Sequence, residues 1–130
     1  MRKLIALLAV AAAFAAVNHA AAQDKAKRGE AVFKRTCAVC HTVEAGKNKI
    51  GPSLAGVVGR KAGSIQGFNY SESMKKSGVT WTEENLEKYL TDPKAFIPGN
   101  RMAFAGIKKE DDREAVIQYL ETLKSASGSS

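Results

Sequence analysis

One five-residue segment constrains this chain more than any other: Cys37-Ala38-Val39-Cys40-His41. Two cysteines separated by two residues, with a histidine directly after the second, form the pattern of covalent haem attachment. The spacing has a mechanical reason, because one turn of chain lets the two thiols reach the two vinyl groups of a single porphyrin. His41 is then held where its Nε2 can ligate the iron. The segment therefore predicts a fold built around one haem.

The first 22 residues have the three parts of a secretory signal. Residues 1–3 carry positive charge, residues 4–17 are apolar and uncharged, and residues 18–22 end in small side chains. The apolar run is about 14 residues long, while a helix that spans a bilayer needs roughly 20. We therefore expect a cleaved signal peptide over residues 1–22, with the cut between Ala22 and Gln23.

Residues 23–130 then form one domain, in which residues 125–130 are a small, polar tail that we expect to be flexible. The domain is basic, with 18 Lys and Arg against 13 Asp and Glu. Its charge is uneven: residues 47–109 hold 11 basic and 5 acidic residues, and residues 110–130 hold 5 acidic and 2 basic. Such a surface suits an anionic partner. A nucleic-acid partner is disfavoured, because no DNA- or RNA-binding motif accompanies the charge.

Other interpretations of the two cysteines remain open at this stage. A structural zinc site needs four ligands, and the domain offers two cysteines and one histidine once His19 leaves with the signal. A thioredoxin-like redox pair needs a βαβ pattern, which this sequence lacks. A plain disulfide is possible in an exported protein. It would explain neither His41 nor the glycine-rich loops.

The hydrophobic pattern predicts an all-α fold with long loops. Helices are expected from Asp24, as N-cap, to about Cys37, over 71–76, from an N-cap at Thr82 to before Pro93, and from Glu110 to the tail. Residues 46–67 hold six glycines and, like 92–106, show little periodicity. Long structureless loops are unusual in a compact domain and need something to wrap around.

Gly29 lies in the middle of the first expected helix of the domain, where glycine costs about 1 kcal/mol relative to alanine. A second helix crossing close to that face would explain it. The last helix carries an apolar stripe at Val116, Tyr119, Leu120 and Leu123 and is the candidate.

Methionine is the next choice for a second axial ligand, because the domain has no other histidine. Met74 lies in a polar stretch, whereas Met102 follows Pro98 and Gly99 in an apolar loop. A lone methionine is usually core filler. A weak thioether ligand needs a constrained loop, so Met102 is the expected ligand.

From Gly29 to Leu123 the sequence resembles the class I cytochromes c, the group of mitochondrial cytochrome c and the bacterial shuttle cytochromes. The matching segments, in chain order, are 29–33, 37–44, 51–54, 67–70, 80–81, 89–90, 98–109 and 119–120. The resemblance implies a class I cytochrome c fold, with N- and C-terminal helices crossing and loops wrapped around one covalent haem c.

The resemblance also implies roles for single residues around that haem. The Pro52 carbonyl would accept a hydrogen bond from His41, and Tyr89 would lie beside the Met102 sulfur. Four further residues would bind the haem propionates: Arg60, Tyr70, Trp81 and Asn100. Six basic residues match positions around the exposed haem edge, where partners would dock: Lys47, Lys49, Lys94, Arg101, Lys108 and Lys109.

These expectations amount to a soluble, periplasmic, monomeric electron carrier between membrane respiratory or photosynthetic complexes. Its electron donor would be a cytochrome bc complex or a dehydrogenase, and its acceptor a terminal oxidase or a photosynthetic reaction centre. With both axial positions filled, an enzymatic role is not expected. The functional alternative is a haem protein with an open iron that acts as a peroxidase or binds gases.

Overall fold

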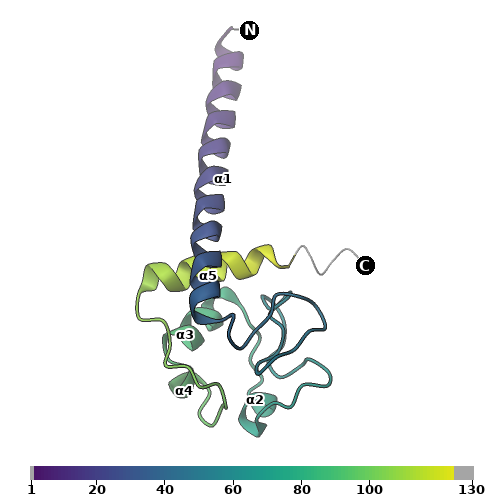
Figure 1. Cartoon of the computed structure of the whole chain (residues 1–130). Coiled ribbons are helices and arrows are strands. Elements are labelled where there is room, and N and C mark those ends of the chain that lie inside the picture. Colours follow the sequence, from purple (N-terminus) through teal and green to yellow (C-terminus); the bar gives the residue numbers. More distant parts are fainter. Residues whose placement is uncertain (1, 125–130) are drawn as a thin grey trace.

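The computed structural model describes residues 2–124, and the expected flexible tail at 125–130 lies outside the described residues. Five helices occur in this range: α1 (Arg2–Thr36), α2 (Glu72–Lys76), α3 (Glu83–Thr91), α4 (Pro93–Phe96) and α5 (Glu110–Thr122). Loops fill the rest, and the one β-bridge of the described range pairs Lys61 with Thr80. The predicted all-α architecture is confirmed, with α5 lying across α1 (Figure 1).

The first helix is longer than expected, and the predicted N-cap at Asp24 is wrong for the full chain. α1 runs without a break from Arg2 through the expected signal peptide and on to Thr36. The physical reason is the run of alanines before Gln23, since alanine is the best helix former. The N-terminal part of α1 projects away from the remainder of the molecule (Figure 1). Within the described residues, none of the helices combines the length and the apolar character that a membrane crossing requires.

The expected crossing between the terminal helices is present at Gly29. A Cβ atom at Gly29 would overlap with the Ala115 carbonyl and lie 2.8 Å from Tyr119 Cβ. Phe33 of α1 packs on Tyr119 of α5, with 5.6 Å between ring centroids. The crossing is framed by exposed ion pairs, among them Arg28 with Asp112 at 2.8 Å. Only a glycine allows the two backbones to approach this closely.

Capping residues define the short helices, at Thr82 as predicted and at Ser71, which was expected inside the helix and lies just before it. The Thr82 side chain accepts a hydrogen bond from the Asn85 amide and starts α3, and Ser71 does the same for α2 through Met74. α4 was not expected, because Pro93 and Pro98 favoured a loop. Pro93 takes the first turn of α4, where its missing N–H costs nothing, and Asp92 caps that helix.

The buried core joins the helices to the loops. Val32, Val116 and Leu120 lie at the α1–α5 crossing, and each is at most 4% exposed. Trp81 and Tyr89 extend the same core toward the loops, with 4.7 Å between their ring centroids. Aromatic side chains therefore form the part of the core nearest the loops, and Cys37 packs against this core.

Candidate functional site

The Cys37–His41 segment forms a tight turn directly after α1. The Cys37 amide donates to Phe33 O at 2.8 Å, and the His41 amide donates to Cys37 O at 2.9 Å. Both cysteines are free thiols and partly buried, so the disulfide interpretation has no support. Burial raises the pKa of the Cys37 thiol, while its contact with the Thr36 hydroxyl at 3.4 Å acts in the opposite direction. The turn keeps the two cysteines close enough for Cys40 to affect the pKa of Cys37.

The hydrogen bond predicted for His41 is present. His41 Nδ1 lies 2.7 Å from the Pro52 carbonyl oxygen. A carbonyl can only accept, so Nδ1 carries the proton and the neutral ring keeps a free lone pair on Nε2. Burial lowers the pKa of His41, and the nearby cations Arg60 and Lys49 lower it further, although the Pro52 hydrogen bond opposes them. Burial and the nearby cations thus favour the neutral ring, and the Pro52 hydrogen bond selects the tautomer that leaves Nε2 available to a metal.

Gly51 has a role at this ring that the sequence did not reveal. A Cβ atom at Gly51 would collide with the imidazole and lie 2.7 Å from Nδ1. The Gly51 amide also donates to Cys40 O at 2.8 Å, which fastens the loop to the haem-attachment turn. The Gly51-Pro52 pair was the available signal, because glycine before a functional proline often marks a close approach of the backbone.

The side chain of Met102 is half-buried and has the neighbour that the resemblance implied. Tyr89 donates its hydroxyl hydrogen to Met102 Sδ, with 3.7 Å between oxygen and sulfur. Burial raises the pKa of Tyr89 to about 12, so the hydroxyl stays protonated and remains a donor at neutral pH. The Met102 amide is fixed as well, because it donates to Asn100 Oδ1 at 3.0 Å.

Met74, the other methionine of the domain, has a different environment. It lies in α2, where its amide donates to Ser71 Oγ at 3.1 Å as part of the helix cap. Its side chain packs against the hydrophobic core, as that of Met102 does, but among the described residues no side chain donates a hydrogen bond to the Met74 sulfur. This arrangement matches a packing role.

Three of the four expected propionate ligands are connected, Trp81 to Arg60 through the backbone and Tyr70 to Arg60 through its electrostatic effect. The Trp81 amide donates to Arg60 O at 2.8 Å beside the Lys61–Thr80 bridge, and Tyr70 is close enough to Arg60 to affect its pKa. Burial lowers the pKa of Arg60, and its guanidinium donates to the carbonyls of Ser53 and Ala55. Within the described residues Arg60 has no carboxylate partner. A half-buried cation of this kind fits the carboxylate of a haem propionate.

Asn100, the fourth, has other partners than expected. It is 3% exposed, and its two amide hydrogens go to Pro93 O and Ile97 O, both at 2.8 Å. An amide nitrogen has only two hydrogens, so none remains for a propionate. Asn100 instead anchors the loop that carries Met102. Its position two residues before Met102 does not reveal this role, because the two carbonyls become its neighbours only in the folded loop.

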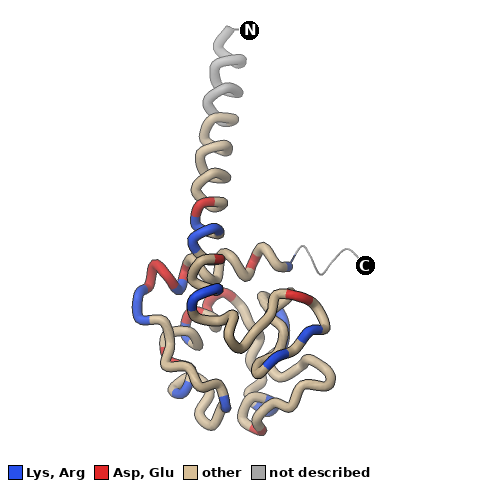
Figure 2. Tube along the Cα trace, viewed as in Figure 1, with Lys and Arg blue, Asp and Glu red and all other residues tan. Residues whose placement is uncertain are grey.

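The six basic residues expected at a docking face are all exposed. Lys47 pairs with Glu44, but the other five form no ion pair among the described residues. By contrast, most basic residues on the helices are neutralised by a neighbour, as Lys88 is by Glu84 at 2.7 Å. Figure 2 shows acidic positions at the start of α5 and basic positions spread over the loops. Positive charge without a partner therefore gathers on the loop side of the domain.

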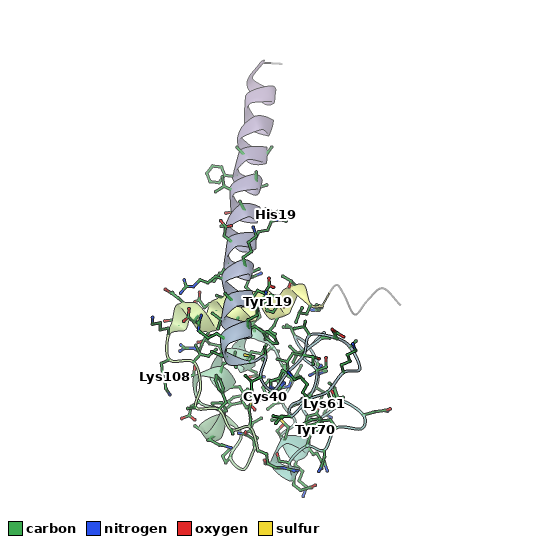
Figure 3. The ribbon with its side chains drawn as sticks, viewed as in Figure 1. His19, Cys40, Lys61, Tyr70, Lys108 and Tyr119 are labelled. Carbon is green, nitrogen blue, oxygen red and sulfur yellow. The ribbon has the colours of Figure 1, made fainter. Side chains whose placement is uncertain are left out.

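The arrangement separates two halves of the molecule. Cys40, Lys61 and Tyr70 lie among the loops below α5, whereas Tyr119 marks the crossing with α1 (Figure 3). The loop half holds the thiols, a neutral imidazole, a hydrogen-bonded thioether and a buried cation. These are the groups that attach, ligate and neutralise a haem, and they fit it chemically.

Comparison with known proteins agrees with this geometry. The family model described as "Cytochrome c" matches residues 26–124. The chain is 65% identical to "Cytochrome c2 iso-2" of Magnetospirillum molischianum, over 68% of this chain and 91% of that protein. It is 52% identical to "Cytochrome c2" of Blastochloris viridis, over 93% of each chain.

A solved structure leads to the same family. The structure of "cytochrome cH from Methylobacterium extorquens" superposes with a TM-score of 0.71 at 44% identity, covering 75% of this chain and 97% of that one. The chain therefore belongs to the cytochrome c family: it is a monohaem electron-transfer protein whose Cys37 and Cys40 fit the motif that attaches one haem c covalently.

Proposed function

We propose that this cytochrome is a one-electron shuttle with a closed, six-coordinate haem iron, ligated by His41 and Met102. The haem supplies the reversible change between Fe(II) and Fe(III). The protein residues fix its two ligands, neutralise a propionate and present one face to partners. The observation that carries the proposal is the hydrogen bond from the Tyr89 hydroxyl to Met102 Sδ, because this bond restricts the orientation of the thioether.

Several contacts support the roles of single residues. Pro52 O holds the His41 ring, and Arg60, Tyr70 and Trp81 surround the position proposed for a buried propionate. A filled sixth position leaves no site for a substrate on the iron, so the protein is proposed not to act as an enzyme. The competing function, an open-iron peroxidase or gas-binding protein, would need Met102 to be absent from the iron.

The visible spectrum of the purified, haem-loaded protein separates these functions. The carrier is expected to show sharp reduced haem bands and, when oxidised, the weak far-red band of a Met–Fe(III) bond. Haem bands without the far-red band would favour an open iron and reject the closed site. A spectrum without haem would reject both.

The docking face is proposed to be the loop side. Its cations without a carboxylate partner among the described residues are Lys49, Lys94, Arg101, Lys108 and Lys109, and Lys47 lies with them. Two large apolar side chains lie at this face as well, Val39 at 72% and Ile50 at 77% exposed. The Lys49 ammonium donates to Ala38 O at 2.7 Å, which brings the two segments together. An apolar centre with a positive rim suits a transient partner with an acidic rim.

The partners are proposed to be membrane electron-transfer complexes. A cytochrome bc complex or a dehydrogenase would donate the electron, and a terminal oxidase or a photosynthetic reaction centre would accept it. Transient docking by charge suits a monomer that must leave each partner quickly. Measuring which purified complex oxidises the reduced protein fastest identifies the acceptor; equal, slow rates with all of them would reject this class of partner.

The periplasm is the proposed compartment, after removal of residues 1–22 as a signal peptide. The similarity to the Blastochloris viridis protein extends over 122 residues, more than residues 23–130 contain, so it includes part of the leader. Mass spectrometry of the exported protein tests this. A chain that begins at Gln23 supports the proposal, and a retained leader contradicts it.

A further inference from the structure

The loop that carries Met102 is anchored at both of its ends. Before Met102, Asn100 holds the loop to α4, as described above, and Arg101 donates to Tyr70 O at 2.7 Å. After Met102, the Ile107 amide donates to Leu90 O at 2.8 Å. Gly106, at a φ of 101°, packs so closely on α3 that a Cβ atom would lie 2.9 Å from Leu90 O. The second anchor thus returns the chain to the C-terminal end of α3.

One side chain of α5 fastens this second anchor. Arg113 Nη1 donates to Ile107 O at 2.8 Å and to Lys108 O at 3.0 Å, so a single guanidinium holds two successive carbonyls of the loop end. The Arg113 side chain is only 12% exposed. Arg113 therefore connects α5 to the loop through a side chain that is largely shielded from solvent.

Glu87 of α3 holds Arg113 in this orientation. Its Oε1 accepts from Arg113 Nε, which forms the least exposed ion pair of the described residues. The other oxygen of Glu87 is buried and has no hydrogen-bond partner in the described part of the chain.

We propose that Glu87 and Arg113 form a positioning pair that keeps Met102 on the haem iron. The inference rests on the proposed function, in which Met102 is the axial ligand. Neither residue touches Met102. They act by fixing the loop end five and six residues after it, which restricts the movement that would withdraw the sulfur. Arginine suits this position because its rigid fork donates to three acceptors at once, which a lysine ammonium cannot do in this geometry.

Imidazole binding to the oxidised holoprotein tests the pair. Imidazole can take the sixth position only while Met102 is off the iron, so its apparent affinity is the intrinsic affinity multiplied by the fraction of open protein. Losing one charge-assisted anchor in Arg113→Lys is expected to raise that affinity about tenfold. Glu87→Gln is expected to act in the same direction and less strongly, because Arg113 keeps its carbonyl partners.

Arg28→Gln is the matched control. It breaks another ion pair to α5, Arg28 with Asp112, which links that helix to α1 and not to the loop. It is expected to lower the melting temperature while leaving the imidazole affinity unchanged. If Arg28→Gln raised the affinity as much as Arg113→Lys, general loosening would explain the effect and the positioning role would be rejected.

A double-mutant cycle with Met102→Ala separates the inference from the proposed function. When Met102 is absent, the sixth position is open, so Arg113→Lys should no longer change imidazole affinity. If the effect of Arg113→Lys persisted in that background, the pair would not act through Met102. If Met102→Ala itself kept the far-red band, the ligand assignment would fail, whatever Arg113 does.

Discussion

At the scale of the residue, hydrogen bonds decide what each haem-site side chain can do. The Pro52 carbonyl places the proton of His41 on Nδ1, and the Tyr89 hydroxyl reaches Met102 Sδ. Both contacts were predicted, because residue types and spacing carry over within a family. The partners of Asn100 were not, because its competing acceptors Pro93 O and Ile97 O become neighbours only when the loop folds.

Met102→Ala is expected to abolish the far-red Met–Fe(III) band and to lower the reduction potential, because a thioether ligand favours Fe(II). Visible spectroscopy and a potentiometric titration measure both effects. Met74→Ala is the matched control and should keep the band. Loss of the band in Met74→Ala, with its retention in Met102→Ala, would reverse the ligand assignment.

Tyr89→Phe is expected to lower the potential, since the hydroxyl withdraws electron density from the sulfur and so disfavours Fe(III). One neutral hydrogen bond contributes about 1 kcal/mol, which corresponds to roughly 40 mV for one electron. Tyr119→Phe, at the far crossing with α1, should leave the potential unchanged. A potential that rises in Tyr89→Phe would contradict this role.

At the scale of the element, close approach and charge fix how the helices meet. The glycine in the middle of α1 predicted a crossing, and Gly29 indeed faces the Ala115 carbonyl. The predicted cap at Thr82 is the start of α3, since a side-chain oxygen that satisfies a free amide is a local signal. α2 begins one residue later than expected, because Ser71 caps the helix instead of belonging to it. The Arg113–Glu87 contact joins residues of two helices and had no such local signal.

Gly29→Ala is expected to destabilise the protein by roughly 1–3 kcal/mol, because overpacking at the Ala115 carbonyl outweighs the gain of about 1 kcal/mol in helix propensity. Thermal or denaturant unfolding of the holoprotein measures the change. Lys27→Ala lies on an exposed part of the same helix and should have little effect. If Gly29→Ala were as stable as the unchanged protein or more so, α1 and α5 would tolerate a methyl group at their crossing, and the close approach would not contribute to stability.

The carboxyl groups of Glu83 and Glu121 provide a pH-dependent prediction where α3 meets α5. Burial and the neighbouring Glu83 raise the pKa of Glu121. A carboxyl whose pKa is raised in the folded state binds its proton more tightly there than in the unfolded chain. The stability that it contributes to the protein is therefore lost as pH rises through that folded-state pKa. Glu83→Gln should therefore bring the pKa of Glu121 closer to its ordinary value and raise the melting temperature at neutral pH. The gain should vanish at acid pH.

Glu84→Gln is the matched control, one residue further along α3, and should show the opposite sign. Its ion pair with Lys88 lowers the pKa of Glu84, so that pair contributes stability above the ordinary carboxyl pKa and loses it as pH falls. NMR titration of the carboxyl groups and melting curves across pH measure both variants. The same sign in both would contradict this reading of the α3 carboxylates.

At the scale of the whole molecule, the unequal distribution of charge matters most. Carboxylates line a groove between α3 and α5, among them Glu84, Glu110 and Glu114. On the loop side, most of the docking-face cations have no carboxylate partner among the described residues. The sequence indicated this division, since acidic residues dominate after residue 110. The structure adds that many helix cations are neutralised by ion pairs, which leaves the loop side as the positive face.

The association rate with an anionic redox partner is expected to fall as ionic strength rises, because salt screens the positive face. Lys94→Gln should reduce that rate roughly two- to fivefold at low salt, in the range of one exposed charge pair. Lys88→Gln, whose charge is already balanced by Glu84, should change it little. Stopped-flow oxidation of the reduced protein at several salt concentrations measures this; a rate independent of salt would reject electrostatic docking.

The sequence by itself determined the chemistry of this protein. The Cys37–His41 segment, the methionine in a loop that a proline stiffens and a glycine allows to turn, and the cap of α3 are local patterns, because covalent spacing and backbone hydrogen bonds act locally. Tertiary structure alone decided which residues share contacts across long separations. In the folded protein Asn100 donates to Pro93 O and Ile97 O, Gly51 packs against the His41 ring, and Glu87 pairs with Arg113. Those contacts depend on how separate segments pack, and no spacing along the chain encodes them.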